Sequence, residues 1–124
     1  MPEPSVIRDV VARYVEGLAS GNAADVAALY APEATLEDPV GSGVHRGRDA
    51  ITAFYADVER VRMRTDLLAV RVAGDSAAFH FRVRTELPDG AVEVEPIDVM
   101  TFDEDGRITS MRAFWSPEDV HPAA

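Results

Sequence analysis

The chain has 124 residues, 47% of them hydrophobic, so we expect residues 1–124 to form one domain around one core. Its 22 acidic residues outnumber its 12 basic ones, and the formal net charge of -10 argues against nucleic acid or a membrane surface as a partner. There is no cysteine and the three histidines are widely spaced, so we expect neither a disulfide framework nor a metal site. The residues after Met1 do not resemble a signal peptide, and no stretch is long enough to span a bilayer, which predicts a cytoplasmic protein.

Three helices are predicted in the first half of the chain from apolar residues at helical spacing. The helices would run from a Ser5 cap to Gly21, from an Asn22 cap to Pro32, and over residues 48–60. Each helix would carry one tyrosine on its buried face, namely Tyr14, Tyr30 and Tyr55.

From Thr65 onward the hydrophobic pattern alternates with a period of 2, which predicts strands. The predicted strands cover residues 65–73, 77–84, 91–102 and 107–115, with Gly, Pro and Asp residues at the turns between them. Only the tail from Ser116 looks loosely held. Three helices followed by antiparallel strands are typical of an α+β fold.

A short strand before these elements ends in a carboxylate. Leu36 and Asp38 share strand parity, so if Leu36 faces the interior, Asp38 faces the same apolar space. Pro39 favours an extended backbone at Asp38 and ends the strand. A carboxylate directed into an apolar cavity is a candidate general base, whereas an Asp before a Pro is also an ordinary turn residue.

A second carboxylate lies on the apolar parity of the predicted strand 91–102, because Asp98 alternates in step with Met100 and Phe102. A carboxyl group buried without a partner keeps its proton and becomes a hydrogen-bond donor. A bulge near Pro96 could instead turn Asp98 to solvent, or Asp98 could cap a backbone group. The three tyrosines are likewise either core aromatics or further donors.

An ionised base, a neutral acid and buried phenols around one cavity suit the removal of a proton beside a carbonyl group. The base takes the proton, while neutral donors stabilise the negative charge that develops on oxygen. Neutral donors serve best when the substrate is apolar, because an apolar pocket binds it and also keeps the acid protonated. These residues therefore predict an enzyme that acts on an uncharged, flat, hydrophobic ketone.

Five segments in this order and spacing resemble the bacterial ketosteroid isomerases, or steroid Δ-isomerases, of the NTF2-like superfamily. The segments are Ala12-Arg13-Tyr14, Ala34-Thr35-Leu36-Glu37-Asp38-Pro39, Ala53-Phe54-Tyr55, Ile97-Asp98-Val99-Met100 with Phe102-Asp103, and Ala113-Phe114-Trp115-Ser116. The resemblance implies three helices packed on a strongly curved, mostly antiparallel sheet that forms a cone. It also implies a homodimer, and we expect no metal and no organic cofactor.

The resemblance further implies a role for each site residue. Asp38 would move a proton from C4 to C6 of a 3-oxo-Δ5-steroid, while Tyr14 and protonated Asp98 would hold the dienolate oxygen. Tyr55 and then Tyr30 would hydrogen-bond in series behind Tyr14. The steroid slot would be lined by Phe54, Phe81, Met111 and Trp115, and the departures from the family, Phe79 and Phe114 in place of methionine and tyrosine, would also lie in the lining.

Three other functions use some of the same features. A polyketide-cyclase-like aldol catalyst could use the same acid and base, and a dimeric binding module for apolar ligands would need neither. Epoxide hydrolysis is disfavoured, because we cannot place a second carboxylate and an arginine on the cavity parity beside Asp38 from the sequence.

Overall fold

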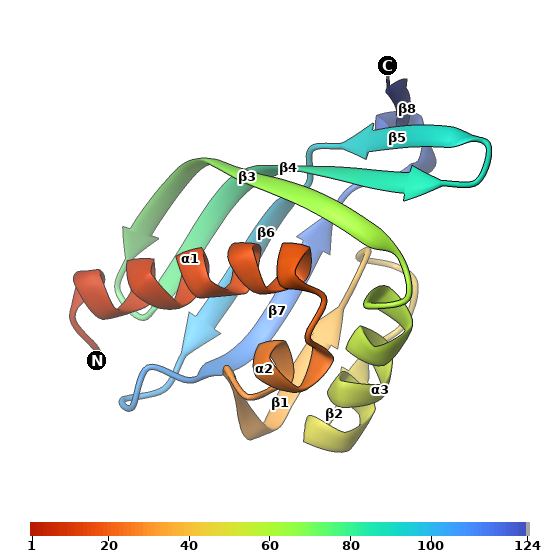
Figure 1. Cartoon of the computed structure of the whole chain (residues 1–124). Helices are drawn as coiled ribbons and strands as arrows, with labels where there is room; N and C mark the ends of the chain where they lie inside the picture. The colour runs from red at the N-terminus through yellow and green to blue at the C-terminus, as the bar shows by residue number, and fades with distance from the viewer. Residues whose placement is uncertain (124) are drawn as a thin grey trace.

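The computed structural model describes residues 1–123, in which three α-helices and a short 3-10 helix accompany eight strands. The helices are α1 (Pro4–Ser20), α2 (Ala23–Ala27), α3 (Arg48–Val58) and η1 (Pro117–Asp119). The strands are β1 (Tyr30–Glu37), β2 (His45–Arg46), β3 (Arg62–Ala73), β4 (Ser76–Leu87), β5 (Gly90–Val94), β6 (Ile97–Phe102), β7 (Ile108–Phe114) and β8 (His121–Ala123). Figure 1 shows the sheet curling around α1, with α2 and α3 beside β1.

The strands form one open sheet, as the predicted α+β class requires. Its order is β2-β1-β7-β6-β4-β5-β8, and β3 pairs with β4 along the other edge of that strand. β1 and β7 are parallel, and the other neighbours are antiparallel. The long β4 pairs with β6 through residues 76–80 and with β5 through residues 83–87, so the sheet divides halfway along β4.

The core lies between α1 and the concave face of the sheet. Ile7, Val11 and Tyr14 recur at helical spacing on α1 and are buried, as the sequence predicts. On β4 the buried residues alternate and include Phe79 and Phe81, so one face of the strand packs on the helix.

The start of α1 differs from the prediction. The helix begins at Pro4 after Glu3, and Ser5 is therefore not its cap. A proline fits the first helical position, because the N–H that it lacks would have no partner inside the helix. The predicted Asn22 cap of α2 is confirmed, since its side chain accepts a hydrogen bond from the backbone N–H of Asp25 at 3.1 Å.

The second helix is shorter than predicted. It ends at Ala27, so Tyr30 lies on β1 rather than on a helix. Pro32 is within β1, at an irregularity between Tyr30 and Thr35 where the pairing with β7 is interrupted. A proline is tolerated there because no ladder hydrogen bond needs its N–H. The third helix ends at Val58, and β3 begins at Arg62, before the predicted start at Thr65.

The predicted strand 91–102 is two strands, β5 and β6, separated at Pro96. The alternation continues across the break: Asp98 and Met100 are buried, whereas Ile97 is exposed. Asp98 therefore faces the interior, and the alternative in which a bulge turns it to solvent is wrong.

The tail after Ser116 is also better held than predicted. Ser116 and Asp119 form a capping box at η1, and β8 then pairs with β5. The segment is too short to carry a hydrophobic pattern of its own, so its order comes from pairing with a distant strand.

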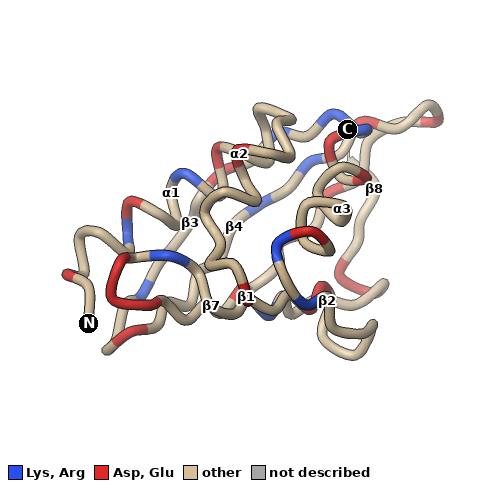
Figure 2. Tube along the Cα trace, turned by 90° about the horizontal axis from the view of Figure 1, so that it is seen from below, with Lys and Arg blue, Asp and Glu red and all other residues tan. Residues whose placement is uncertain are grey.

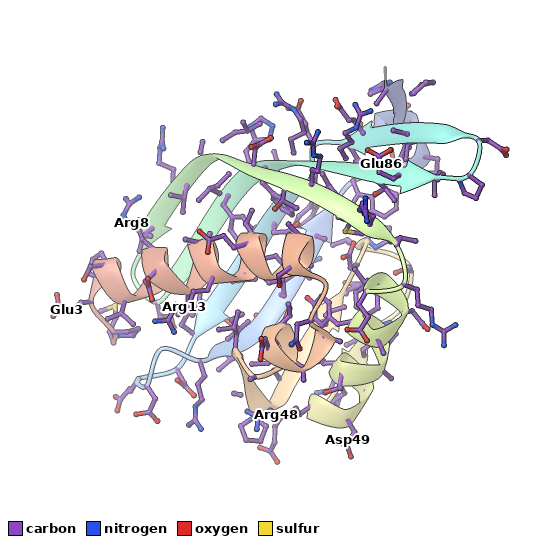
Figure 3. All side chains as sticks on the ribbon, in the orientation of Figure 1. Glu3, Arg8, Arg13, Arg48, Asp49 and Glu86 are labelled. Carbon is purple, nitrogen blue, oxygen red and sulfur yellow. The ribbon has the colours of Figure 1, made fainter. Side chains whose placement is uncertain are left out.

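Most of the charged side chains lie on the outside of the molecule. Figure 2 shows acidic and basic residues scattered along the trace, and Figure 3 shows Arg8 and Asp49 pointing away from the body. On the outer face of the sheet, Arg82 lies 3.4 Å from Glu95. Exposed pairs of this kind contribute little to stability. Within residues 1–123 no helix is long and apolar enough to cross a membrane.

Candidate active site

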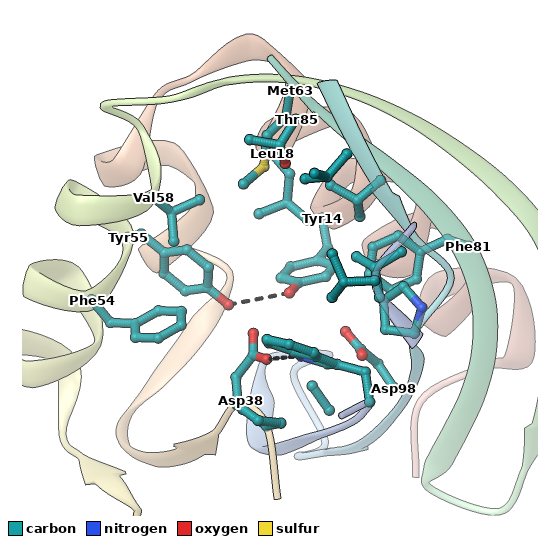
Figure 4. A pocket seen from close by; sticks show the side chains of 18 residues that line it. Tyr14, Leu18, Asp38, Phe54, Tyr55, Val58, Met63, Phe81, Thr85 and Asp98 are labelled. Carbon is teal, nitrogen blue, oxygen red and sulfur yellow. Dashed lines mark hydrogen bonds between the residues drawn. The ribbon is translucent and has the colours of Figure 1, made fainter. Parts of the chain in front are cut away.

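The concave side of the sheet holds a cavity of about 480 Å³. The helices α1 and α3, the strands β3 to β7 and the tail all contribute to its wall. Most of that wall is apolar. Its polar groups at one end are Tyr14, Tyr55, Asp38 and Asp98, which come from four separate segments of the chain (Figure 4).

Asp38 follows directly after β1 and lines the cavity, as its parity with the buried Leu36 predicts. Its Oδ1 accepts a hydrogen bond of 2.7 Å from the indole Nε1 of Trp115. Burial raises the pKa of the Asp38 carboxyl, whereas the Trp115 donor and the nearby His45 lower it. On balance the pKa of Asp38 is raised, but less strongly than that of Asp98, so Asp38 is the more readily ionised of the two carboxyl groups and the one suited to accept a proton.

Asp98 has a different environment, although it faces the same cavity. It is 1% exposed, and its Oδ1 has no hydrogen-bond partner within residues 1–123. Burial raises the pKa of Asp98 well above its ordinary value, the charge of Asp38 raises it further, and the Tyr14 hydroxyl opposes the shift. Asp98 therefore holds a proton when Asp38 is ionised, and that proton can be donated to a ligand.

The three tyrosines form a hydrogen-bonded series. The hydroxyl oxygens of Tyr30 and Tyr55 are 2.7 Å apart, and the Tyr55 hydroxyl donates to that of Tyr14 over 3.4 Å. Since Tyr55 has one proton to donate, Tyr30 must be the donor of the first bond. Burial raises the pKa of all three tyrosines, so the phenols stay neutral. The Tyr14 proton remains available to an acceptor in the cavity.

Neighbouring contacts fix the positions of these phenols. Arg48, at the start of α3, donates to the backbone carbonyl of Tyr30 and joins α3 to β1. The ring of Tyr14 packs edge-on against Phe79 and Phe81, with centroids 5.9 and 6.3 Å away. One end of the cavity therefore presents a proton acceptor opposite neutral donors, and the ketone chemistry expected from the sequence needs this arrangement.

A family model described as a SnoaL-like domain matches residues 11–111. The chain belongs to the SnoaL-like family. This SnoaL-like protein is 56% identical over 114 residues to a protein of Nocardioides simplex named steroid Delta-isomerase, and the match covers 92% of this chain and 93% of that protein. The resemblance to steroid Δ-isomerases stated from the sequence is therefore confirmed.

Two further relatives have other names. The epoxide hydrolase LasB of Streptomyces lasalocidi is 29% identical over a match that covers 96% of this SnoaL-like chain and 44% of LasB. A solved structure of SalBIII, an epoxide hydrolase/cyclase-like enzyme in pyran ring formation of the polyether salinomycin, is 25% identical with a TM-score of 0.92. That match covers 99% of this chain and 100% of SalBIII, so the whole fold is common to both.

The structure brings most of the predicted lining residues of this SnoaL-like protein to the cavity. Phe54, Phe81 and Trp115 line it. The prediction for Met111 is wrong. Its side chain is only 1% exposed and does not line the cavity; Met111 lies on β7 between its strand partners Leu36 and Met100, in the hydrophobic core.

The two departures from the family pattern do not lie in the lining either. Phe114 is 42% exposed, and the Arg112 guanidinium lies 5.2 Å from its ring centroid on the outer face of the sheet. Phe79 is buried behind the cavity, where it touches Tyr14.

Sequence reasoning missed several residues at the site, three of which bear on its chemistry or its shape. His45 packs on Phe54 with ring centroids 5.2 Å apart and lowers the pKa of Asp38, while Thr85 and Val120 line the cavity. The parity that Thr85 shares with Phe81 could have predicted its direction. No sequence signal indicates that Val120 folds back over the cavity.

Proposed function

We propose that this protein is a steroid Δ-isomerase that converts 3-oxo-Δ5-steroids into 3-oxo-Δ4-steroids. The observation that carries the proposal is the contrast between two carboxyl groups, Asp38 and Asp98, at the same end of an apolar cavity. Asp38 accepts a hydrogen bond from Trp115 that favours its ionised form, whereas Asp98 has an unpartnered oxygen and the charge of Asp38 raises its pKa. The relative named steroid Delta-isomerase supports the same conclusion.

The reaction is an internal transfer of one proton. Asp38 removes a proton from C4, and the electron pair of that C–H bond moves into a dienolate. The dienolate oxygen on C3 accepts hydrogen bonds from Tyr14 and protonated Asp98. Asp38 then delivers the proton to C6, so the C5–C6 double bond becomes a C4–C5 double bond and the enzyme returns to its starting state. Because nothing is oxidised or reduced, the residues described suffice for these steps.

The tyrosines behind Tyr14 act as positioning residues. Tyr30 donates to Tyr55 and Tyr55 donates to Tyr14, so the Tyr14 hydroxyl keeps its own proton directed into the cavity. A series of hydrogen bonds at low dielectric polarises the last donor. Phe54, Phe81 and Trp115 provide the apolar wall for the fused rings.

A second candidate, epoxide opening, is supported by one observation. Asp98 is a second carboxyl group in the cavity with Asp38, and an acid and a base together could protonate an epoxide and deprotonate its nucleophile. LasB and SalBIII are named for such chemistry. No arginine side chain lines the cavity within residues 1–123.

The deciding assay mixes the protein with 5-androstene-3,17-dione and follows the absorbance of the conjugated enone. We expect turnover, and we expect Asp38→Ala to reduce kcat by about 10² to 10⁴ because a general base is lost. Near-normal turnover by Asp38→Ala would contradict the assignment of the base. No turnover by the unchanged protein would favour epoxide opening, an aldol cyclase or a binding module for apolar ligands.

We further propose that the protein is a homodimer that pairs through the outer face of its sheet. That face carries the exposed Ile97 and Phe114, which pair across β6 and β7, beside ion pairs such as Arg82 with Glu95. Mixed apolar and polar surface is usual at such interfaces. Sedimentation should give a dimer at micromolar concentration, and a monomer alone would contradict this proposal.

A further inference from the structure

The end of the cavity opposite the two carboxyl groups contains one hydroxyl group. Thr85 lies there with Leu18 and Met63, away from Asp38 and Asp98 (Figure 4). The alternation of β4 accounts for its direction, since Thr85 follows Phe81 and Val83 on the inward face. This hydroxyl group takes no part in the proposed proton transfer.

The surroundings of Thr85 are apolar. On the neighbouring strands it pairs with Met63 of β3 and Val92 of β5, and both of these residues also line the cavity. Leu18 and Val94 complete this part of the wall. The Thr85 hydroxyl makes no hydrogen bond to any side chain or backbone group of residues 1–123, and its residue is only partly buried, so water reaches it in the free protein.

A ligand that fills this end of the cavity either provides a hydrogen-bond partner for the Thr85 hydroxyl or leaves that hydroxyl without one. If the ligand has only carbon there, it displaces water and leaves Thr85 unpaired, which costs binding free energy. If the ligand carries an oxygen there, Thr85 can donate to a ketone, or either donate to or accept from an alcohol. The hydroxyl therefore discriminates between ligands by what they carry at their far end.

The separation of the two polar ends requires an elongated ligand. Asp98 pairs with Phe79 on β4, and Thr85 follows Phe79 by six residues, which is about 20 Å along an extended strand before allowing for its curvature. A small ketone held at Tyr14 and Asp98 would not reach Thr85, whereas a molecule of four fused rings extends toward it.

We propose that Thr85 is a specificity-determining residue that hydrogen-bonds an oxygen on the D ring of the steroid, at the end opposite the 3-ketone. This inference rests on the proposed isomerase function and adds the residue that recognises the oxygen at C17 of the substrate. Thr85 contributes to binding and not to the proton transfer, because it lies far from C4 and C6.

The test compares two substrates, 5-androstene-3,17-dione and 5-androsten-3-one, which differ only in the C17 oxygen. The unchanged enzyme should prefer the dione in kcat/KM by about three- to tenfold, the range expected for one neutral hydrogen bond. Thr85→Val keeps the shape of the side chain and removes the hydroxyl. The preference for the dione should therefore disappear, because KM for the dione rises while kcat changes little. Thr85→Ser, the matched control, should retain the preference.

A binding experiment separates this inference from the proposed function. Estrone and 17-deoxyestrone should differ in Kd by a similar factor for the unchanged protein and should bind equally to Thr85→Val. If neither ketone is turned over, the proposed function fails, and the Kd comparison still decides the role of Thr85. The inference would be overturned if Thr85→Val still bound estrone more tightly than 17-deoxyestrone, or if the substitution weakened the binding of both ligands by the same factor.

Discussion

Asp38 and Asp98 are chemically the same side chain, and their neighbours assign them different tasks. The indole N–H of Trp115 donates a hydrogen bond that stabilises Asp38 as a carboxylate. The Oδ1 of Asp98 has no such donor, so a negative charge on Asp98 would not be stabilised there. The two groups are also coupled, because the charge of Asp38 raises the pKa of Asp98. Of the two carboxyl groups, Asp98 therefore holds a proton more tightly than Asp38.

A phenolic steroid should bind Asp38→Asn more tightly than it binds the unchanged protein. The phenol oxygen imitates the dienolate oxygen and gathers negative charge at Tyr14 and Asp98, close to the ionised Asp38. Asparagine imitates the neutral acid that Asp38 becomes after it has taken the proton, so this repulsion disappears. A difference of about 1.4 kcal/mol corresponds to tenfold in Kd.

Titration of estrone near neutral pH measures both constants, and Thr52→Val, at a partly buried position of α3 that does not line the cavity, is a control that should leave Kd unchanged. Equal constants for Asp38→Asn and the unchanged protein, or weaker binding by the variant, would show that Asp38 is not coupled to the site of Tyr14 and Asp98.

Tyr14 and Asp98 should act on the same oxygen. We expect Tyr14→Phe and Asp98→Leu each to reduce kcat by roughly 10² to 10³, as for removal of one oxyanion donor. The double variant should lose less than the product of the two, because the donors share one acceptor. Asp98→Asn keeps a donor and should be milder than Asp98→Leu. Equal damage from Asn and Leu would argue against donation by Asp98.

At the scale of single elements, the local sequence pattern predicted which side chains face inward, but it did not predict which strands pair with one another. The alternation on β4 and β6 predicted that Phe81 and Asp98 face inward, because parity is a local property of the backbone. It could not predict that the chain breaks at Pro96, since β5 and β6 are separated by where each pairs along β4.

The tyrosines give the same lesson. Helical spacing placed Tyr14 and Tyr55 on buried faces, but Tyr30 lies on β1, and the series of hydroxyls exists only because α1, α3 and β1 meet. The Trp115 donor to Asp38 likewise joins residues separated by 77 positions, so no local pattern could have predicted it. The family resemblance indicated that these residues act together, whereas their residue types alone indicated a base, an acid and neutral donors.

Removing residues 117–124 should weaken substrate binding while preserving the chemical step. This deletion takes away η1 and β8, together with Val120, which lines the cavity, but leaves Trp115 on Asp38. Losing part of an apolar wall should raise KM by about tenfold, since burying a valine side chain stabilises by about 1.5 to 3 kcal/mol when complete. Steady-state kinetics on the dione would measure this, with Val120→Ala as the milder comparison. An unchanged KM would mean that the tail does not cover the substrate.

At the scale of the whole molecule, burying Asp98 lowers the free energy of unfolding above the ordinary pKa of an aspartate. Because the folded state raises the pKa of Asp98, the folded protein binds a proton that the unfolded chain has already lost. Below the ordinary pKa of an aspartate, about 3.9, both states are protonated and Asp98 costs nothing through ionisation. As the pH rises above that value, the free energy of unfolding falls by up to about 1.4 kcal/mol per pH unit until the pH reaches the raised pKa.

We therefore expect Asp98→Asn to be more stable than the unchanged protein at neutral pH and to lose that advantage near pH 4. Glu95 and Asp103 have lowered pKa values, so their contribution is present at neutral pH and is lost on acidification, which is the opposite direction. Both proteins contain those groups, and their effect cancels in the difference between the two unfolding curves. Urea unfolding at a fixed protein concentration and several pH values would measure that difference. A gap between the proteins that stays constant with pH would mean that Asp98 does not hold a proton in the folded protein, and the neutral donor would have to be Tyr14 alone.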